Sequence, residues 1–128
     1  MGNRAKGPKH KLSKLHKRKN SLWLCYQKIH RVYCPALKEN VYFTKLGWNH
    51  LVERKNRPTR EYFRRLEVLP CARKVVELSR TCQGKHINPK DGIEYVNLIA
   101  VIAGITIKVT ITRIGKGRFT FFSVRRLL

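Results

Sequence analysis

Hydroxyl, cationic and aromatic side chains alternate along two neighbouring segments near the end of the chain, a combination that suits the binding of a phosphate group. Every second residue from 106 to 112 is Thr or Lys, and every second residue from 119 to 125 is Phe, Ser or Arg. A two-residue turn at residues 115–116 would place Lys108 opposite Ser123. An ammonium group and a hydroxyl group held close together can both donate to phosphate oxygens.

This register predicts a polar cluster beside aromatic rings. Residues opposite each other on antiparallel strands lie about 5 Å apart. The groups expected to converge on one phosphate-sized spot are Lys108, Thr110, Ser123 and Arg125. Phe119 and Phe121 would lie beside them, with ring faces on which a base can stack. A one-residue slip would instead put Phe122 and Val124 on this face, and the whole pattern is also typical of an ordinary solvent-exposed sheet face.

Alternation of apolar and polar residues predicts that these positions lie on antiparallel strands. Residues 93–101 form one expected strand, Gly104 a turn or bulge, and residues 105–112 the next strand. A hairpin turn at 114–117 leads to a return strand over 118–125. The C-terminal part of the chain is therefore expected to be a meander that ends in a hairpin.

Helical spacing dominates the part of the chain that precedes these strands. The expected helices cover residues 22–32, 45–54 and 59–78, the last one kinked or split at Pro70, and a short extended piece lies at 40–44. Residues 82–92 carry turn signals throughout and are expected to form a loop. The predicted fold class is α+β, with N-terminal helices packed on a C-terminal antiparallel β-sheet.

Residues 1–20 are rich in Lys and Arg and contain no acid. Gly2, Gly7 and Pro8 oppose a long helix there, and few apolar residues are available for packing. We expect residues 1–20 to be a basic, disordered tail that contacts nucleic acid without sequence preference. Residues 21–128 are enough for one α+β domain and too few for two.

The balance of charge is strongly basic. The chain has 29 Lys and Arg residues against 7 Asp and Glu, a formal net charge of +22, and 42% hydrophobic residues allow a modest core. Nucleic acid fits such a surplus, since each contacted phosphate releases a counterion. The longest apolar run, residues 98–107, is shorter than the about 20 residues that a bilayer requires, and the apolar stretch 22–26 is too short for a signal peptide. We therefore expect a cytoplasmic protein that binds RNA and does not bind a membrane.

The cysteines show none of the close spacings of a zinc site. Cys25, Cys34, Cys71 and Cys82 include no C-x-x-C pair, and reduced thiols are the expected state. A zinc site made of Cys25, His30 and Cys34 is the alternative. The seven acids form no plausible Mg²⁺ cluster, so the sequence predicts neither a metal nor a cofactor.

Two stretches, taken together, resemble a known superfamily. One covers residues 41–55 and continues through 65–72, and the other covers residues 107–124. Their order and residue types resemble the phage- and toxin-associated barnase/EndoU/colicin/RelE-like ribonuclease superfamily. In those domains a helix that bears a histidine packs against a terminal antiparallel sheet with Lys, Arg, Ser or Thr across one face. The resemblance implies that residues 21–128 form a single RNase-like domain.

Carried over position by position, the resemblance implies a set of site residues. It makes His50 the general acid or base, with Lys55 or Arg54 beside it. The implied catalytic residues are His50, Lys55, Lys108 and Ser123, and the implied substrate-binding residues are Arg54, Arg65, Thr110, Arg113 and Arg125, to which the hairpin register adds Phe121. No second histidine is expected in the sheet, so two imidazoles cannot share the acid and base roles.

The activity that follows is that of a metal-independent, toxin-like endoribonuclease, in which the RNA 2′-OH attacks the neighbouring phosphate. His50 would be the base because imidazole titrates near neutral pH, and Lys108 with an arginine would stabilise the added negative charge. The alternative is a non-catalytic RNA- or ribosome-binding protein that uses the same basic face. A DNA-binding helix-turn-helix over residues 44–80 is a third interpretation, which leaves the sheet without a purpose. The RNA would be tRNA, mRNA or rRNA, and an acidic antitoxin or immunity protein would suit so basic a surface.

Overall fold

Most of the helices precede most of the strands along the chain. The computed structural model describes residues 6–53 and 59–127, and within them the side chains of residues 17–53 and 60–127. The first part contains α1 (Lys6–Gln27), β1 (Arg31–Cys34), β2 (Glu39–Tyr42) and α2 (Lys45–Val52). The second part contains α3 (Thr59–Val68), the 3₁₀ turn η2 (Leu69–Cys71), α4 (Ala72–Leu78), β3 (Gly84–Ile87), β4 (Ile93–Ile102), β5 (Ile105–Ile114) and β6 (Phe119–Arg126).

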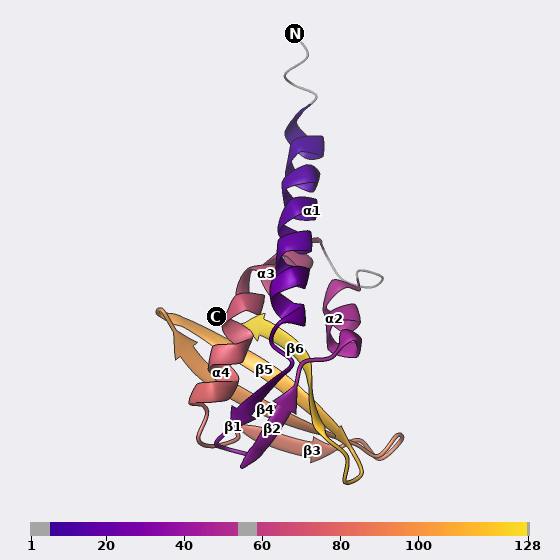
Figure 1. The fold of residues 1–128 in the computed structure, drawn as a ribbon, viewed down its shortest axis with the longest axis vertical. Helices are drawn as coiled ribbons and strands as arrows, with labels where there is room; N and C mark the ends of the chain where they lie inside the picture. Colours follow the sequence, from indigo (N-terminus) through magenta and orange to yellow (C-terminus); the bar gives the residue numbers. More distant parts are fainter. Residues whose placement is uncertain (1–5, 54–58, 128) are drawn as a thin grey trace.

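The strands join one mixed sheet in the order β1-β2-β6-β5-β4-β3 (Figure 1). β3 to β6 form an antiparallel meander, and the hairpin of β1 and β2 is attached to it through a short parallel pairing of β2 with β6. The predicted fold class, α+β with helices packed on a C-terminal antiparallel meander that ends in a hairpin, is confirmed.

One face of the sheet forms the core, as the alternation in β4 and β5 requires. The fully buried positions are Val96, Leu98, Ile107, Val109 and Ile111. α3 and α4 pack on the sheet, and Figure 1 shows α4 lying across the strands. The opposite side of β3–β6, which we call the outer face, carries the half-buried residues that alternate with the core positions: Tyr95, Asn97, Thr106, Lys108, Thr110 and Thr112.

A cluster of aromatic rings anchors α1 and α2 to the sheet. The ring of Tyr26 on α1 lies 5.6 Å from that of Trp48 on α2, 5.9 Å from that of Phe43 and 6.0 Å from that of Phe121 on β6. The Tyr26 hydroxyl donates to the main-chain oxygen of Thr44 at 2.6 Å. The first half of α1 projects away from the rest of the fold (Figure 1), so the described contacts of α1 come from its last turns.

The start of the chain differs from the prediction in two ways. The helix predicted over residues 22–32 ends at Gln27, because His30 has a φ of 57° and the next residues pair with β2. Residues 6–20 are helical in the structure, although the sequence indicates a disordered tail. Gly7 and Pro8 lie in the first turn of α1, where the N–H that Pro lacks has no partner within the helix. Residues 1–5 of the predicted tail lie outside the described residues.

The loop predicted over residues 82–92 contains an edge strand. β3 pairs with β4 in antiparallel register, with His86 opposite Tyr95. The Asn-Pro and Asp-Gly turn signals are used, since residues 88–92 connect the two strands. Pairing with the long β4 makes a strand of Gly84–Ile87, although its local sequence does not favour one.

Gly47 lets α2 approach β6 closely. A Cβ atom at this position would overlap the main-chain oxygen of Phe121 and would meet the Tyr26 hydroxyl at 3.0 Å. Gly47 is buried in the first turn of α2, so the next turn, which carries His50, lies directly beside β6. Further along the chain, η2 separates α3 from α4 at Pro70, as predicted.

Candidate nucleic-acid interface

The pairing of β5 with β6 differs from the register predicted from the sequence. Thr112 lies opposite Thr120 near the turn, one residue away from the predicted pairing with Phe119. Beyond a β-bulge between Thr110 and Ile111 the shift grows to two residues, so Lys108 lies opposite Arg125 and Thr110 opposite Ser123. The predicted pairing of Lys108 with Ser123 is therefore wrong, because the strands are already displaced by one residue next to the turn and the bulge adds one extra residue of β6.

The new register exchanges the positions of two neighbouring phenylalanines. Phe121 is 1% exposed, and its ring stacks on that of Phe43 at 4.9 Å inside the core. The prediction that Phe121 offers a stacking surface beside the polar cluster is therefore wrong, and Phe119 is buried as well. Phe122, the extra residue of the bulge, is half-buried, and its ring meets that of Tyr95 on the outer face edge-on at 5.8 Å.

Four rings follow one another from α2 to β3 across this part of the molecule. The ring centroid of His50 lies 3.9 Å from that of Phe122, and His86 stacks on Tyr95 at 5.2 Å with an interplanar angle of 13°. We call His50, Phe122, Tyr95 and His86 the aromatic row. The prediction of no second histidine in the sheet is wrong, because His86 belongs to β3. Two rings separate it from His50, so the imidazoles do not form an acid–base pair at one phosphate.

Hydroxyl and amide groups lie beside the aromatic row. Thr110 Oγ1 donates to Asn97 Oδ1 at 2.9 Å, and the hydroxyls of Thr112 and Thr120 share a hydrogen bond of 3.1 Å. Ser123 is 9% exposed, and its hydroxyl has no hydrogen-bond partner among residues 17–53 and 60–127. Of the two predicted site residues that carry a hydroxyl, Thr110 and Ser123, it is therefore Ser123 whose proton is uncommitted.

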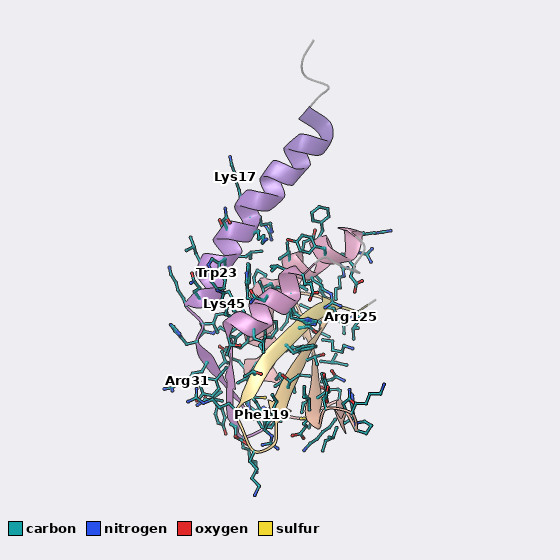
Figure 2. All side chains as sticks on the ribbon, turned by 90° about the vertical axis from the view of Figure 1, so that its right-hand side faces the viewer. Lys17, Trp23, Arg31, Lys45, Phe119 and Arg125 are labelled. Carbon is teal, nitrogen blue, oxygen red and sulfur yellow. The ribbon has the colours of Figure 1, made fainter. Side chains whose placement is uncertain are left out.

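Two cations lie opposite each other on neighbouring strands. Lys108 is half-buried on β5, and Arg125 is exposed near the end of β6, beside α3 (Figure 2). Neither side chain has an ion-pair partner within the part of the chain that the structure describes. Like charges directly opposite each other destabilise a sheet, and a bound phosphate would remove the repulsion. The structure thus brings together two of the cations that the sequence pointed to.

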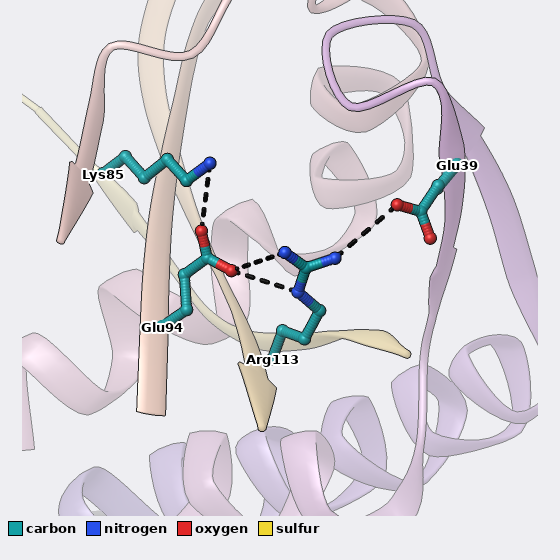
Figure 3. A network of polar contacts seen from close by, with 4 residues as sticks. All are labelled: Glu39, Lys85, Glu94 and Arg113. Carbon is teal, nitrogen blue, oxygen red and sulfur yellow. Dashed lines mark hydrogen bonds and ion pairs between the residues drawn. The ribbon is translucent and has the colours of Figure 1, made fainter. Parts of the chain in front are cut away.

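Arg113 lies on the opposite side of the sheet from these groups. Its Nε and Nη2 atoms contact one carboxylate oxygen of Glu94 at 3.0 and 2.9 Å, and its Nη1 atom lies 3.7 Å from Glu39 (Figure 3). Lys85 reaches the other oxygen of Glu94 at 3.1 Å. The Cζ atom of Arg113 also lies over the ring of Phe119, 4.3 Å from the ring centroid. The predicted place of Arg113 among the phosphate-binding cations is wrong, because its position in β5 points it to the face that carries Glu94.

The network around Glu94 is expected to stabilise the fold in a pH-dependent way. Burial raises the pKa of this carboxyl, but hydrogen bonds and charges from Lys85 and Arg113 outweigh burial and hold the pKa below its ordinary value of 4.5. We expect Glu94→Gln to lower the free energy of unfolding by about 2 kcal/mol at pH 7, because charge-assisted hydrogen bonds are lost. Urea denaturation would measure the change.

Acidification gives the control for this prediction. Because the folded state lowers the pKa of Glu94, its contribution is complete above the ordinary carboxyl pKa and is lost as the pH falls through the folded-state pKa. The matched variant is Glu77→Gln, which removes an exposed ion pair with Arg73 worth about 0.3–0.5 kcal/mol. A Glu94→Gln deficit that does not shrink on acidification would contradict the role of the carboxylate charge.

Arg65 lies on α3, next to the end of β6. Its Nη2 atom contacts Glu61 one helical turn earlier at 3.0 Å, and its side chain is 13% exposed. It borders a hollow that is also lined by Arg125, so it lies near the cation pair formed by Lys108 and Arg125. The predicted roles of Arg54 and Lys55 remain predictions, because both residues lie outside the described part of the chain.

Several residues of this interface were not among the site residues predicted from the sequence. Tyr95 and Asn97 follow the alternation of β4, which was a usable signal for their place on the outer face. Arg60 and Arg64 are spaced one helical turn apart on α3, another pattern that can be read from the sequence. His86 carried no such signal, because β3 forms only by pairing with β4.

Neither a metal-binding group nor similarity to a known protein assigns a function to this interface. Among the residues that the structure describes, no group of three or more His, Cys, Asp and Glu side chains is placed to hold a metal ion, and no described helix is long and apolar enough to cross a membrane. Comparisons with protein-family models, curated proteins and solved structures find no match.

Proposed function

We propose that this chain is a metal-independent endoribonuclease that binds single-stranded RNA on the outer face and cleaves it beside His50. The observation that carries the proposal is the position of the His50 ring, 3.9 Å from that of Phe122. Phe122 precedes Ser123 on β6, and Ser123 lies opposite Thr110, one outer-face position away from Lys108. An imidazole, a hydroxyl and a cation near one another supply groups that RNA transesterification uses.

In the proposed reaction, His50 accepts the proton of a ribose 2′-OH. The O2′ atom attacks the adjacent phosphorus while the bond from phosphorus to the next O5′ breaks, and that oxygen takes up a proton from an acid or from water. The products end in a 2′,3′-cyclic phosphate and a 5′-OH. The Ser123 hydroxyl donates to a nonbridging oxygen, and Lys108 with Arg125 stabilises the negative charge that develops on the phosphate in the transition state.

The aromatic row supports single-stranded RNA as the substrate. Unpaired bases stack on aromatic side chains, each contributing about 1–3 kcal/mol to binding, whereas bases inside a duplex are not accessible for such stacking. Phe122, Tyr95 and His86 lie beyond His50 in one continuous series of ring contacts. A strand whose bases follow this series would bring its backbone past Ser123.

A non-catalytic RNA-binding protein is the second candidate, and the aromatic row itself favours it. His50 is one of four rings in that row, so base stacking alone would account for its position. The basic surface and the unpaired cations would serve this function equally well. The two candidates therefore differ in whether products form, and binding strength does not separate them.

The decisive experiment follows the fate of labelled, unstructured RNA in the presence of EDTA. We expect the wild-type chain to release fragments that end in 2′,3′-cyclic phosphate. A matched oligonucleotide with one 2′-deoxy nucleotide at a cleaved position should remain intact at that position, because the attacking oxygen is missing. Stable binding of varied RNAs without products would contradict the nuclease and support the second candidate. Cleavage at the deoxy position would contradict the proposed chemistry.

A further inference from the structure

Arginines gather around a hollow between α3 and the end of β6. Its volume is about 330 Å³, and it is lined by Arg60, Glu61, Arg64, Arg65, Arg125 and Arg126. Arg60 and Arg64 lie on successive turns of α3, and the last two arginines are neighbours near the end of β6. α3 packs against β6, so two segments far apart in sequence supply guanidinium groups to one place. We call this feature the arginine hollow.

The positive charge of the arginine hollow is mostly uncompensated. Its one acid, Glu61, forms an ion pair of 3.0 Å with Arg65. Within the described chain, Arg60, Arg64 and Arg126 take part in no ion pair. The Nε atom of Arg65 is buried without a hydrogen-bond partner in the same part of the chain, although a buried donor normally has one.

An anion with several acceptor oxygens would compensate the charge of the exposed arginines in this hollow. Guanidinium groups that line one hollow repel one another, and the repulsion disappears when a negative charge lies between them. A planar guanidinium donates two parallel hydrogen bonds to a phosphate, which makes arginine suited to phosphate recognition. The arginines that line the hollow are mostly exposed to solvent. A phosphate on a flexible strand can therefore reach them.

We propose that the arginine hollow binds a phosphate group of the RNA strand next to the phosphate that lies at Lys108 and Ser123. This inference rests on the proposed function, which sets the path of the RNA strand past Ser123. Arg125 belongs to both places, because it lines the hollow and lies opposite Lys108. From Ser123 to Arg125 the strand advances by about 7 Å, so the two phosphate positions are close neighbours. The phosphate is either internal or a 5′-terminal monophosphate.

Binding of an RNA that cannot be cleaved tests the arginine hollow separately from catalysis. The probe is an unstructured oligonucleotide with 2′-O-methyl groups throughout, prepared once with a 5′-OH and once with a 5′-phosphate. We expect Arg64→Gln in the full chain to weaken binding about tenfold, as loss of a charge-assisted hydrogen bond predicts. The slope of log K against log salt should fall by about 0.7, as for one phosphate contact on a single strand.

The matched control is Arg31→Gln, since Arg31 is exposed on β1 at the other side of the molecule (Figure 2). Arg60→Gln is a second variant with the same expected result as Arg64→Gln. A larger loss on the 5′-phosphate probe identifies a terminal phosphate, and equal losses on both probes identify an internal one. If Arg64→Gln and Arg60→Gln bind within twofold of Arg31→Gln, the proposal is overturned, whether or not the wild type cleaves RNA.

Discussion

Replacement of His50 by alanine is expected to reduce the single-turnover rate of RNA cleavage by about 10²–10⁴-fold, the usual contribution of a positioned general base. The physical reason is that a 2′-OH is a weak nucleophile until a base removes its proton. The ring of His50 lies against Phe122, the residue that precedes Ser123 on β6. The measurement is a rate at saturating protein, so that a change in affinity does not alter it.

The control must separate the loss of a base from the loss of an aromatic ring. His86→Ala removes an imidazole from the far end of the aromatic row and is expected to leave the single-turnover rate unchanged. Added imidazole should restore part of the activity of His50→Ala, because a free base can enter the space that the side chain leaves. Equal rates for wild type and His50→Ala would exclude His50 as the base, and an imidazole effect on wild type and variant alike would exclude rescue.

Much of the fold can be read from the sequence because β4 and β5 alternate with the period of a half-buried strand. The buried positions Ile107, Val109 and Ile111 are separated by Lys108 and Thr110, and this pattern fixes which side of β5 faces the helices. It places Thr106, Lys108, Thr110 and Thr112 on the outer face, as the structure has them. The fold class follows from the order of helical and alternating segments.

The register of β6 could not be predicted in the same way. In the segment Phe119-Thr-Phe-Phe-Ser-Val124, alternation holds as far as Phe121 and then breaks, because Phe122 and Val124 are also apolar. A bulge resolves the conflict by placing Phe121 and Val124 in the core and leaving Phe122 outside. Local sequence does not show where a bulge lies, since its position depends on how the rings of Tyr26 on α1 and of Phe43, which follows β2, fill the core beside Phe121.

The candidate site was predictable where it depended on β5 and unpredictable where separate elements meet. The prediction of His50 as a site residue came from the resemblance. Its contact with Phe122 depends on the close approach of α2 to β6 that Gly47 allows. The arginine hollow forms because α3 packs beside the end of β6, and no periodicity in the sequence predicts that packing. His86 joins the site through an edge strand with weak local preference, so tertiary pairing alone placed it there.

The two neighbouring phenylalanines of β6 should respond in opposite ways to substitution. Phe122→Ala is expected to weaken binding of 2′-O-methyl RNA about tenfold or more, because one stacking surface is lost, and to lower the free energy of unfolding less than Phe121→Ala does, because Phe122 is only half-buried. Phe121→Ala should lower that free energy by about 3–5 kcal/mol, because a cavity forms beneath the rings of Tyr26 and Phe43. Fluorescence anisotropy and urea denaturation measure the two quantities.

Phe121→Leu keeps the comparison interpretable if the alanine variant does not fold. Leucine fills much of the same space, so the variant should remain folded and bind RNA within twofold of wild type. The opposite pattern, with RNA affinity lost in Phe121→Leu and retained in Phe122→Ala, would mean that Phe121 faces the ligand. The hairpin would then have the register predicted from the sequence, with Thr110 opposite Phe121. Lys108 would no longer lie opposite Arg125, and the phosphate position shared with the arginine hollow would not exist.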